Sequence, residues 1–207
     1  MVAAKICGLN DPAGVAAAVA GGARFVGFVF YPPSPRHVTP SVAADLMARV
    51  PPGVTRVGLF VDADDDALEA ALAAPLDLLQ FHGAETPERV AAVKRKFGLP
   101  VMKAIPVAAA ADVAFAGKYL GVADRLLFDA KPPRDPAALP GGNGLAFDWQ
   151  LLGARQWSLP WMLSGGLTAQ NLAEAVATTH APAVDVSSGV EIRPGIKDSA
   201  KIAAFLK

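Results

Sequence analysis

The runs FVGFVF (residues 25–30) and TRVGLFV (residues 55–61) are apolar almost from end to end. A half-exposed strand alternates polar and apolar side chains, whereas a strand covered on both faces is apolar almost throughout. Short runs rich in valine and phenylalanine are typical of such buried strands. The two runs therefore predict strands of a parallel sheet that has other elements packed on both of its faces.

Similar runs recur along the whole chain and alternate with Ala-rich amphipathic segments. We expect eight strands, at Ala3–Cys7, Phe25–Phe30, Arg56–Val61, Leu76–Phe81, Val101–Ile105, Arg125–Asp129, Trp161–Ser164 and Ala183–Val186. A helical segment is expected after each strand, at Pro12–Ala20, Val42–Arg49, Asp65–Ala73, Pro87–Lys96, Ala108–Gly117, Asp148–Leu152, Ala169–Thr178 and Lys197–Leu206. Thr86 before Pro87 and Thr168 before the seventh segment have the residue types that cap helices.

Eight strand-helix units in 207 residues indicate an α/β fold, a single (β/α)8 TIM barrel that forms one domain over residues 1–207. No linker or change in composition marks a second domain. An open doubly wound sheet is the alternative for the same alternation. Active sites of such barrels lie at the carboxyl ends of the strands, which narrows the search to eight places.

Composition excludes several classes of partner. Nineteen basic residues balance nineteen acidic ones, and the longest basic run, at residues 94–96, reads as a solvated helix end, so we expect no nucleic-acid partner. The single cysteine excludes an intramolecular disulfide and leaves no cysteine and histidine cluster at zinc spacing, so no metal site is expected. Without a signal pattern or a long apolar segment, we expect a soluble cytoplasmic protein with no membrane contact.

Two strand ends carry side chains that could transfer protons. Cys7 ends the first strand, and alternation puts Lys5 on the same face. Cys7 could be a base or nucleophile if its pKa is lowered, but a lone buried cysteine is more often an inert apolar residue. Asp129 follows three apolar residues at the end of the sixth strand. It is either a structural cap or ion-pair partner, or a general acid whose pKa its surroundings raise.

The ends of strands seven and eight are rich in glycine and serine. Gly165 and Gly166 follow one strand, and Ser187 and Ser188 follow the other. Glycines allow backbone N–H groups to approach an anion, serines add hydroxyl donors, and these two loops often hold phosphate in TIM barrels. We therefore predict a phosphate site, although a lone glycine pair is commonly only a turn.

Other strand ends offer weaker signals. Arg36 lies in a proline-rich loop that could hold it rigidly against a carboxylate, but a solvated arginine is the simpler interpretation. His82 ends strand four, where spacing alone favours a histidine packed in the core; we also count it as a candidate substrate-binding residue. The GGNG run at residues 141–144 follows a loop rather than a strand, so we discard a dinucleotide site there.

The motifs taken together resemble the phosphoribosylanthranilate isomerase family of tryptophan biosynthesis. The resemblance covers residues 3–204 and rests on KICG (5–8), SPR (34–36), QFHG (80–83), FD (128–129), GG (141–142), FDW (147–149), GGL (165–167) and DVSSGVE (185–191). Asn143, Phe81 and Ser164 depart from the family's usual threonine, leucine, and alanine or aspartate. None of the three is a proposed catalytic group.

The resemblance implies an Amadori rearrangement of N-(5-phosphoribosyl)anthranilate without a metal or organic cofactor. Asp129 would be the general acid that opens the furanose ring, and Cys7 the general base that removes the proton from C2. Arg36 would bind the anthranilate carboxylate, and Asp185 would lie near the ribose hydroxyls. Gly165, Gly166, Ser187 and Ser188 would hold the phosphate. The expected partner is thus a phosphorylated small molecule, bound by a monomer or a homodimer.

Three other functions remain open from the residues. The related sugar isomerase of histidine biosynthesis performs the same rearrangement on a larger substrate, but its family resemblance calls for an aspartate where this chain has Cys7. A barrel of this kind could also bind a phosphorylated ligand without turning it over. A role for Cys7 as a covalent nucleophile needs a neighbouring base, and neither His37 nor His82 can be placed beside it from sequence.

Overall fold

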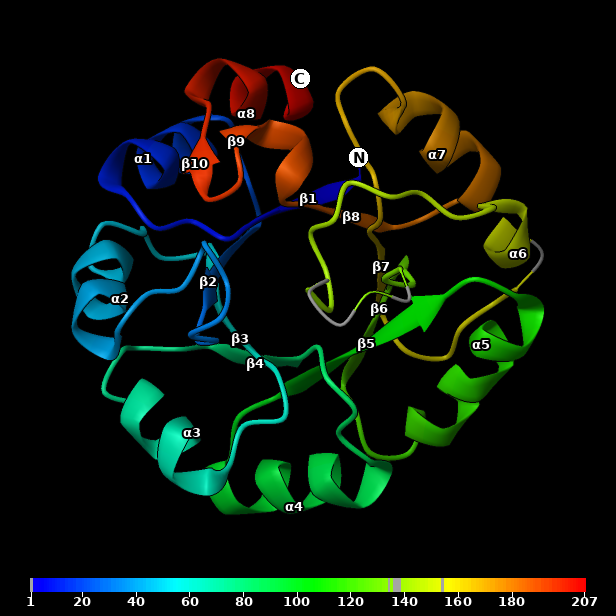
Figure 1. The fold of residues 1–207 in the computed structure, drawn as a ribbon, viewed down its shortest axis with the longest axis horizontal. Coiled ribbons are helices and arrows are strands. Elements are labelled where there is room, and N and C mark those ends of the chain that lie inside the picture. The colour runs from blue at the N-terminus through cyan, green and yellow to red at the C-terminus, as the bar shows by residue number, and fades with distance from the viewer. Residues whose placement is uncertain (1, 134, 136–138, 154) are drawn as a thin grey trace.

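The computed structural model describes residues 2–133, 135, 139–153 and 155–207. Eight parallel strands form a closed barrel in the order β1 to β8, and β1 pairs with both β2 and β8 to complete the ring. Figure 1 looks into the barrel, with the strands in the centre and the helices outside them. The predicted (β/α)8 barrel is confirmed, and the alternative of an open sheet is wrong.

The barrel strands lie within two residues of their predicted ends. They are β1 (Ala3–Cys7), β2 (Phe25–Val29), β3 (Thr55–Phe60), β4 (Leu78–Phe81), β5 (Val101–Val107), β6 (Arg125–Ala130), β7 (Trp161–Leu163) and β8 (Ala183–Val186). The helices of the described residues are α1 (Pro12–Ala20), α2 (Pro40–Met47), α3 (Asp65–Ala71), α4 (Pro87–Phe97), α5 (Ala110–Phe115), α6 (Gln150–Gly153), α7 (Leu172–Thr179) and α8 (Ser199–Phe205).

Side-chain caps explain where several helices begin. Thr86 accepts a hydrogen bond from the Arg89 N–H, so its predicted capping of α4 is confirmed. Thr39 caps α2 in the same way, and this helix therefore begins at Pro40 rather than Val42. The prediction for α7 is wrong: the helix begins at Leu172 with Asn171 as its N-cap residue, and Asn171 accepts a hydrogen bond from the N–H of Thr168.

Four short elements were not predicted. The 3₁₀ helix η1 (Ala116–Tyr119) continues α5, and η2 (Ser188–Val190) follows β8. The strands β9 (Glu191–Arg193) and β10 (Ile196–Lys197) form an antiparallel hairpin before α8. Lys197 was expected to start the last helix, but it lies in this hairpin, and Asp198 caps α8.

The apolar side chains of β2 are buried on both faces of the barrel wall. Phe25 packs in the barrel interior with residues such as Val57 and Met102, whereas Val26 and Phe28 pack in the larger cluster between strands and helices. This two-sided burial is the reason that the strand has no polar side chain. None of the described helices is both long and apolar enough to cross a lipid bilayer.

Candidate active site

A cavity opens at the carboxyl ends of the strands. Residues from the ends of strands on all sides of the barrel line it, because closure of the barrel brings these ends around one mouth. The lining includes every predicted site residue: Cys7, Arg36, His82, Asp129, Gly165, Gly166, Asp185, Ser187 and Ser188.

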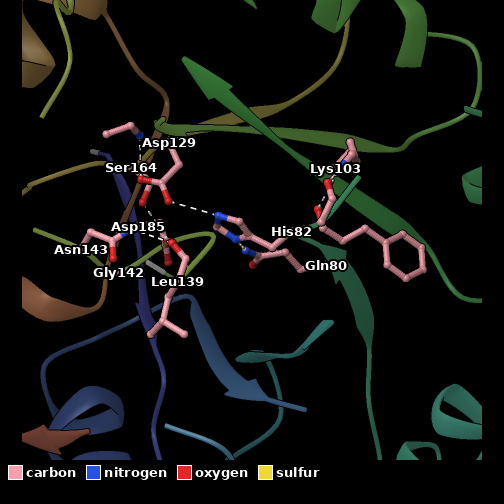
Figure 2. Close-up of polar contacts among 12 residues, drawn as sticks. Gln80, His82, Lys103, Asp129, Leu139, Gly142, Asn143, Ser164 and Asp185 are labelled. Carbon is pink, nitrogen blue, oxygen red and sulfur yellow. Dashed lines mark hydrogen bonds and ion pairs between the residues drawn. The ribbon is translucent and has the colours of Figure 1, made fainter. Parts of the chain in front are cut away.

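Asp129 faces His82 across the cavity mouth. Figure 2 shows the His82 ring between Gln80 and Asp129, with 3.1 Å between His82 Nε2 and Asp129 Oδ2. The amide nitrogen of Gln80 lies 3.1 Å from His82 Nδ1, so both ring nitrogens of His82 have a polar partner. The other Asp129 oxygen accepts the N–H of Ala130 at 2.9 Å. His82 thus lines the cavity rather than packing in the core.

Cys7 lies above a charged pair inside the barrel. Lys5 Nζ donates to Asp185 Oδ1 at 2.8 Å, and Ser164 Oγ donates to Asp185 Oδ2 at 3.2 Å. Burial raises the pKa of the Cys7 thiol, and the positive charge of Lys5 opposes this rise. Burial also disfavours the Lys5 ammonium, but the charges of Asp185 and Cys7 outweigh it and raise the pKa of Lys5. The net pKa of Cys7 is therefore above its ordinary value.

Arg36 is buried and fixed, in contrast to the simpler expectation of a solvated loop arginine. The loop after β2 returns to that strand through the bridge between Val29 and His37. Arg36 Nε and Nη2 donate to the two oxygens of Glu191 at 2.8 and 2.9 Å, and Nη2 also donates to the Gly142 carbonyl at 3.2 Å. Such a bidentate pair fixes the plane of the guanidinium.

The β9–β10 hairpin supplies the partners of Arg36 and of the predicted phosphate loop. Lys197 Nζ donates to Glu191 Oε1 at 2.8 Å and to the Ser187 carbonyl at 3.0 Å. Burial lowers the pKa of Lys197. Burial also disfavours the ionised Glu191, but hydrogen bonds and charges from Arg36 and Lys197 bring its pKa below the ordinary value. The hairpin therefore joins the Arg36 side of the cavity to the loop after β8.

The two glycine-rich loops approach other backbone closely. Gly165 and Gly166 have φ values of +92° and +64° in the left-handed region, where a side chain is strained. A Cβ at Gly165 would lie 2.8 Å from the backbone nitrogen of Ala130, and one at Gly166 would lie 2.8 Å from that of Ala146. Glycine is therefore required at both positions, and the loop can present its backbone to the cavity.

The run at residues 141–144 also lines the cavity. A Cβ at Gly141 would lie 2.6 Å from His82 Nε2 and 2.8 Å from Asp129 Oδ2, and one at Gly142 would lie 2.7 Å from Arg36 Nη1. These glycines therefore pass directly over the charged side chains. No role was predicted for residues 141–144 once a dinucleotide site was discarded. The paired glycines were nevertheless a sequence signal that the backbone approaches other groups closely.

Sequence reasoning also missed the residues that hold the predicted side chains in place. Gln80, Glu191 and Lys197 contact them directly, yet no role was predicted for these three. Glu191 was the easiest of the three to predict from sequence, because it is an acidic residue at the end of the run predicted to bind phosphate. For Lys197 the sequence offered no signal beyond its charge.

Comparisons with known proteins agree over the whole chain. The family model for N-(5'phosphoribosyl)anthranilate (PRA) isomerase matches residues 4–207. The chain is 65% identical over 206 residues to the N-(5'-phosphoribosyl)anthranilate isomerase of Rhodospirillum centenum, covering 99% of this chain and 96% of the relative.

Solved structures give the same result. The chain is similar to phosphoribosyl anthranilate isomerase from Thermotoga maritima, with a TM-score of 0.89, 36% identity and coverage of 100% and 98% of the two chains. It is also similar to such an isomerase in complex with reduced 1-(o-carboxyphenylamino)-1-deoxyribulose 5-phosphate. There the TM-score is 0.84, the identity 34%, and the coverage 100% and 97%.

Proposed function

Because the chain belongs to the N-(5'-phosphoribosyl)anthranilate isomerase family and catalyses its isomerisation in tryptophan biosynthesis, we propose that Asp129 and Cys7 perform the proton transfers. In the first step, Asp129 donates a proton to the furanose ring oxygen as the C1–O bond breaks, which leaves a Schiff base at C1. In the second step, Cys7 removes the proton from C2. The resulting enolamine tautomerises to the ketone as C1 gains a proton and the C2 hydroxyl loses one. Cys7 then releases its proton to solvent, and Asp129 takes one up before the next turnover.

The observation that carries this proposal is the position of the two groups in one cavity. Cys7 ends β1 and Asp129 lies near the end of β6, so they reach the cavity from different sides. An acid and a base that approach one sugar from two directions can act on different atoms without competing. His82 lies 3.1 Å from Asp129 and holds the carboxyl group in place from the other side of the cavity mouth.

The remaining predicted residues would position the substrate. Arg36 is the proposed partner of the anthranilate carboxylate: Glu191 holds Nε and Nη2, while Nη1 faces the Gly142 backbone at the cavity wall. Gly165, Gly166, Ser187 and Ser188 are proposed to hold the phosphate, with the Lys197 charge nearby through Ser187. Asp185 is proposed to contact the ribose. Binding energy from such remote groups can orient the reacting carbon and increase kcat.

The pKa of Cys7 sets the pH dependence that this mechanism requires. Burial raises this pKa, and a base must be deprotonated before it accepts a proton. The thiolate fraction therefore grows as the pH rises toward the raised pKa. We expect kcat/KM, which reports the free enzyme, to increase with pH above neutrality.

Replacing the thiol tests the base directly. We expect Cys7→Ala and Cys7→Ser to fold normally and to lose about 10²–10⁴-fold in kcat, the usual contribution of a positioned general base. The measurement is the fluorescence loss as phosphoribosylanthranilate is consumed, with the histidine-pathway substrate run in parallel. Near-normal turnover by Cys7→Ala would remove Cys7 from the mechanism.

We further propose that residues 1–207 form one domain that works in the cytoplasm as a monomer or a homodimer. A biosynthetic enzyme with a single free cysteine is consistent with a reducing compartment, where thiols stay reduced. Among the relatives, the Thermotoga maritima isomerase is dimeric, and monomers have been generated from it. The proposed ligand is a phosphorylated small molecule, and an equal number of acidic and basic residues gives no support to a nucleic-acid partner.

A further inference from the structure

Lys5 is a buried cation to which the proposed proton transfers give no role. It lies on β1 two residues before Cys7, and its side chain is 0% exposed. Its ammonium contacts Asp185 from β8 at 2.8 Å. A buried ion pair is weak evidence for a role in stability, because apolar residues of similar size often serve as well. We therefore looked for a role of the Lys5–Asp185 pair in the cavity that lies above it.

The space left by Gly27 brings the ammonium and the thiol together. Gly27 lies opposite Cys7 in the β1–β2 ladder. A Cβ on Gly27 would lie 3.0 Å from Cys7 Sγ and 3.1 Å from Lys5 Nζ. Both atoms are thus within 3.1 Å of a single point and cannot be further apart than twice that distance. Gly27 lies in a regular strand, so glycine is not needed there for a turn. Its missing side chain instead leaves room for the Cys7 thiol and the Lys5 ammonium.

Three charged groups act on the thiol from the surrounding strands. Lys5 lies below it on β1, Asp185 faces it from β8, and Lys197 acts on it from β10. Burial disfavours the thiolate most strongly, and Lys5 is the largest influence in the opposite direction. Asp185 disfavours the thiolate but also holds the Lys5 ammonium, so it keeps this charge in place. Lys197 has a smaller effect, and Glu191 contacts it directly.

We propose that Lys5 is a positioning residue that stabilises the Cys7 thiolate, with Asp185 holding the ammonium under the sulfur. This inference rests on the proposed role of Cys7 as the base. Lys5 keeps its proton throughout, since the proton that Cys7 gains comes from C2 of the sugar. The ammonium favours the ionised form of the base, and the thiol can then act nearer neutral pH than its burial alone would permit.

The single cysteine makes the test specific. The rate of alkylation by iodoacetamide as a function of pH reports the titration of Cys7 alone, because the chain has one cysteine and this residue lines the cavity. For Lys5→Met we expect the midpoint of this titration to rise by about 1–3 pH units, the usual effect of losing an opposite charge at this range. We also expect kcat at neutral pH to fall at least tenfold, with a much smaller change in KM.

A second variant covers the case in which Lys5→Met leaves Asp185 unpaired and does not fold. Lys5→Met/Asp185→Asn replaces the pair with neutral residues of similar size, and its midpoint is compared with that of Asp185→Asn alone. The matched control is Lys103→Met/Glu85→Gln, which removes another buried lysine pair, at 2.9 Å, from outside the barrel interior. We expect the midpoint to rise in the first double variant and to stay unchanged in the control.

The outcomes separate the two proposals. An unchanged midpoint in folded Lys5 variants overturns the role of Lys5, even if Cys7→Ala is inactive. A midpoint that rises in the Lys5 variants and not in the control supports it. If that rise occurs while kcat does not follow the thiol titration, the proposed role of Cys7 as base fails, whereas the effect of Lys5 on the thiolate stands.

Discussion

At the residue scale, Asp129 is the group with the clearest single test. Asn at this position keeps the shape and can still accept the Ala130 N–H, but it has no acidic proton to donate. We expect Asp129→Asn to lose about 10²–10⁴-fold in kcat while its unfolding midpoint changes little. Steady-state kinetics and thermal unfolding of the same preparations measure the two effects.

A matched control for this change is Asp45→Asn, because Asp45 is exposed on α2. Asp112 is less suitable, since its carboxylate accepts the N–H groups of Ala108 and Ala109 at the start of α5. Turnover by Asp129→Asn at the rate of the Asp45→Asn control would contradict the assignment of the general acid.

The sequence located these side chains but not their environments. A strand end with a lone carboxylate or thiol indicates the barrel mouth, so Cys7 and Asp129 could be predicted as candidates. The sequence could not show that burial raises the pKa of Cys7, because this shift depends on the residues that the other strands place around the sulfur. For the same reason Arg36 read as a solvated side chain, although Glu191 holds it in the structure.

At the scale of elements, a buried ion pair holds the loop after β4 against β5. Lys103 Nζ donates to Glu85 Oε2 at 2.9 Å and to the Gly83 carbonyl at 2.6 Å. Glu85 in turn accepts the N–H groups of Gly83 and Asp62. Figure 2 shows Lys103 on the other side of His82 from Asp129. The pair therefore orders the loop that begins at His82.

We expect Lys103→Met to lower the free energy of unfolding by about 3–5 kcal/mol, because it leaves the Glu85 carboxylate buried without its cation. Lys103→Met/Glu85→Gln should recover much of this loss. Denaturant unfolding measures both changes. The control is Lys94→Met, which breaks a half-exposed pair with Asp124 and should cost no more than about 1 kcal/mol. A loss for Lys103→Met as small as that of the control would show that the loop does not depend on this pair.

Most elements were predictable to within two residues, and the main exception is the β9–β10 hairpin. Strands and long helices follow from apolar runs, which the chain carries in each unit. The β9–β10 hairpin is short and its two isoleucines are exposed, so it was not predicted, and its last residue, Lys197, was assigned to the last helix. Yet this hairpin carries Glu191 and Lys197 into the site.

For the whole molecule, binding of an anion at the loops after β7 and β8 should stabilise the folded barrel. These loops join distant parts of the chain: a Cβ at Gly189 would overlap the carbonyl of Leu167. Inorganic phosphate at about 100 times its Kd would add about 2.7 kcal/mol to the free energy of unfolding. For a chain of this length, that corresponds to a rise in Tm of about 5–10 °C.

Thermal unfolding in phosphate and in chloride of equal ionic strength measures this effect. Ser187→Ala/Ser188→Ala removes two hydroxyl donors and should reduce the difference between the two salts. Equal Tm values for the wild-type protein in both salts, across a wide range of phosphate concentrations, would exclude phosphate binding at these loops.

The sequence by itself determined the barrel, its strand ends and the residue types at its mouth, because alternation of apolar runs is a local property. Only the tertiary structure decided which charges meet. Lys5 and Asp185 are 180 residues apart in the chain, Arg36 and Glu191 are 155 apart, and His82 and Asp129 are 47 apart. Each contact depends on closure of the ring between β1 and β8 or on the loops above it, and the electrostatics of the thiol follow from those contacts.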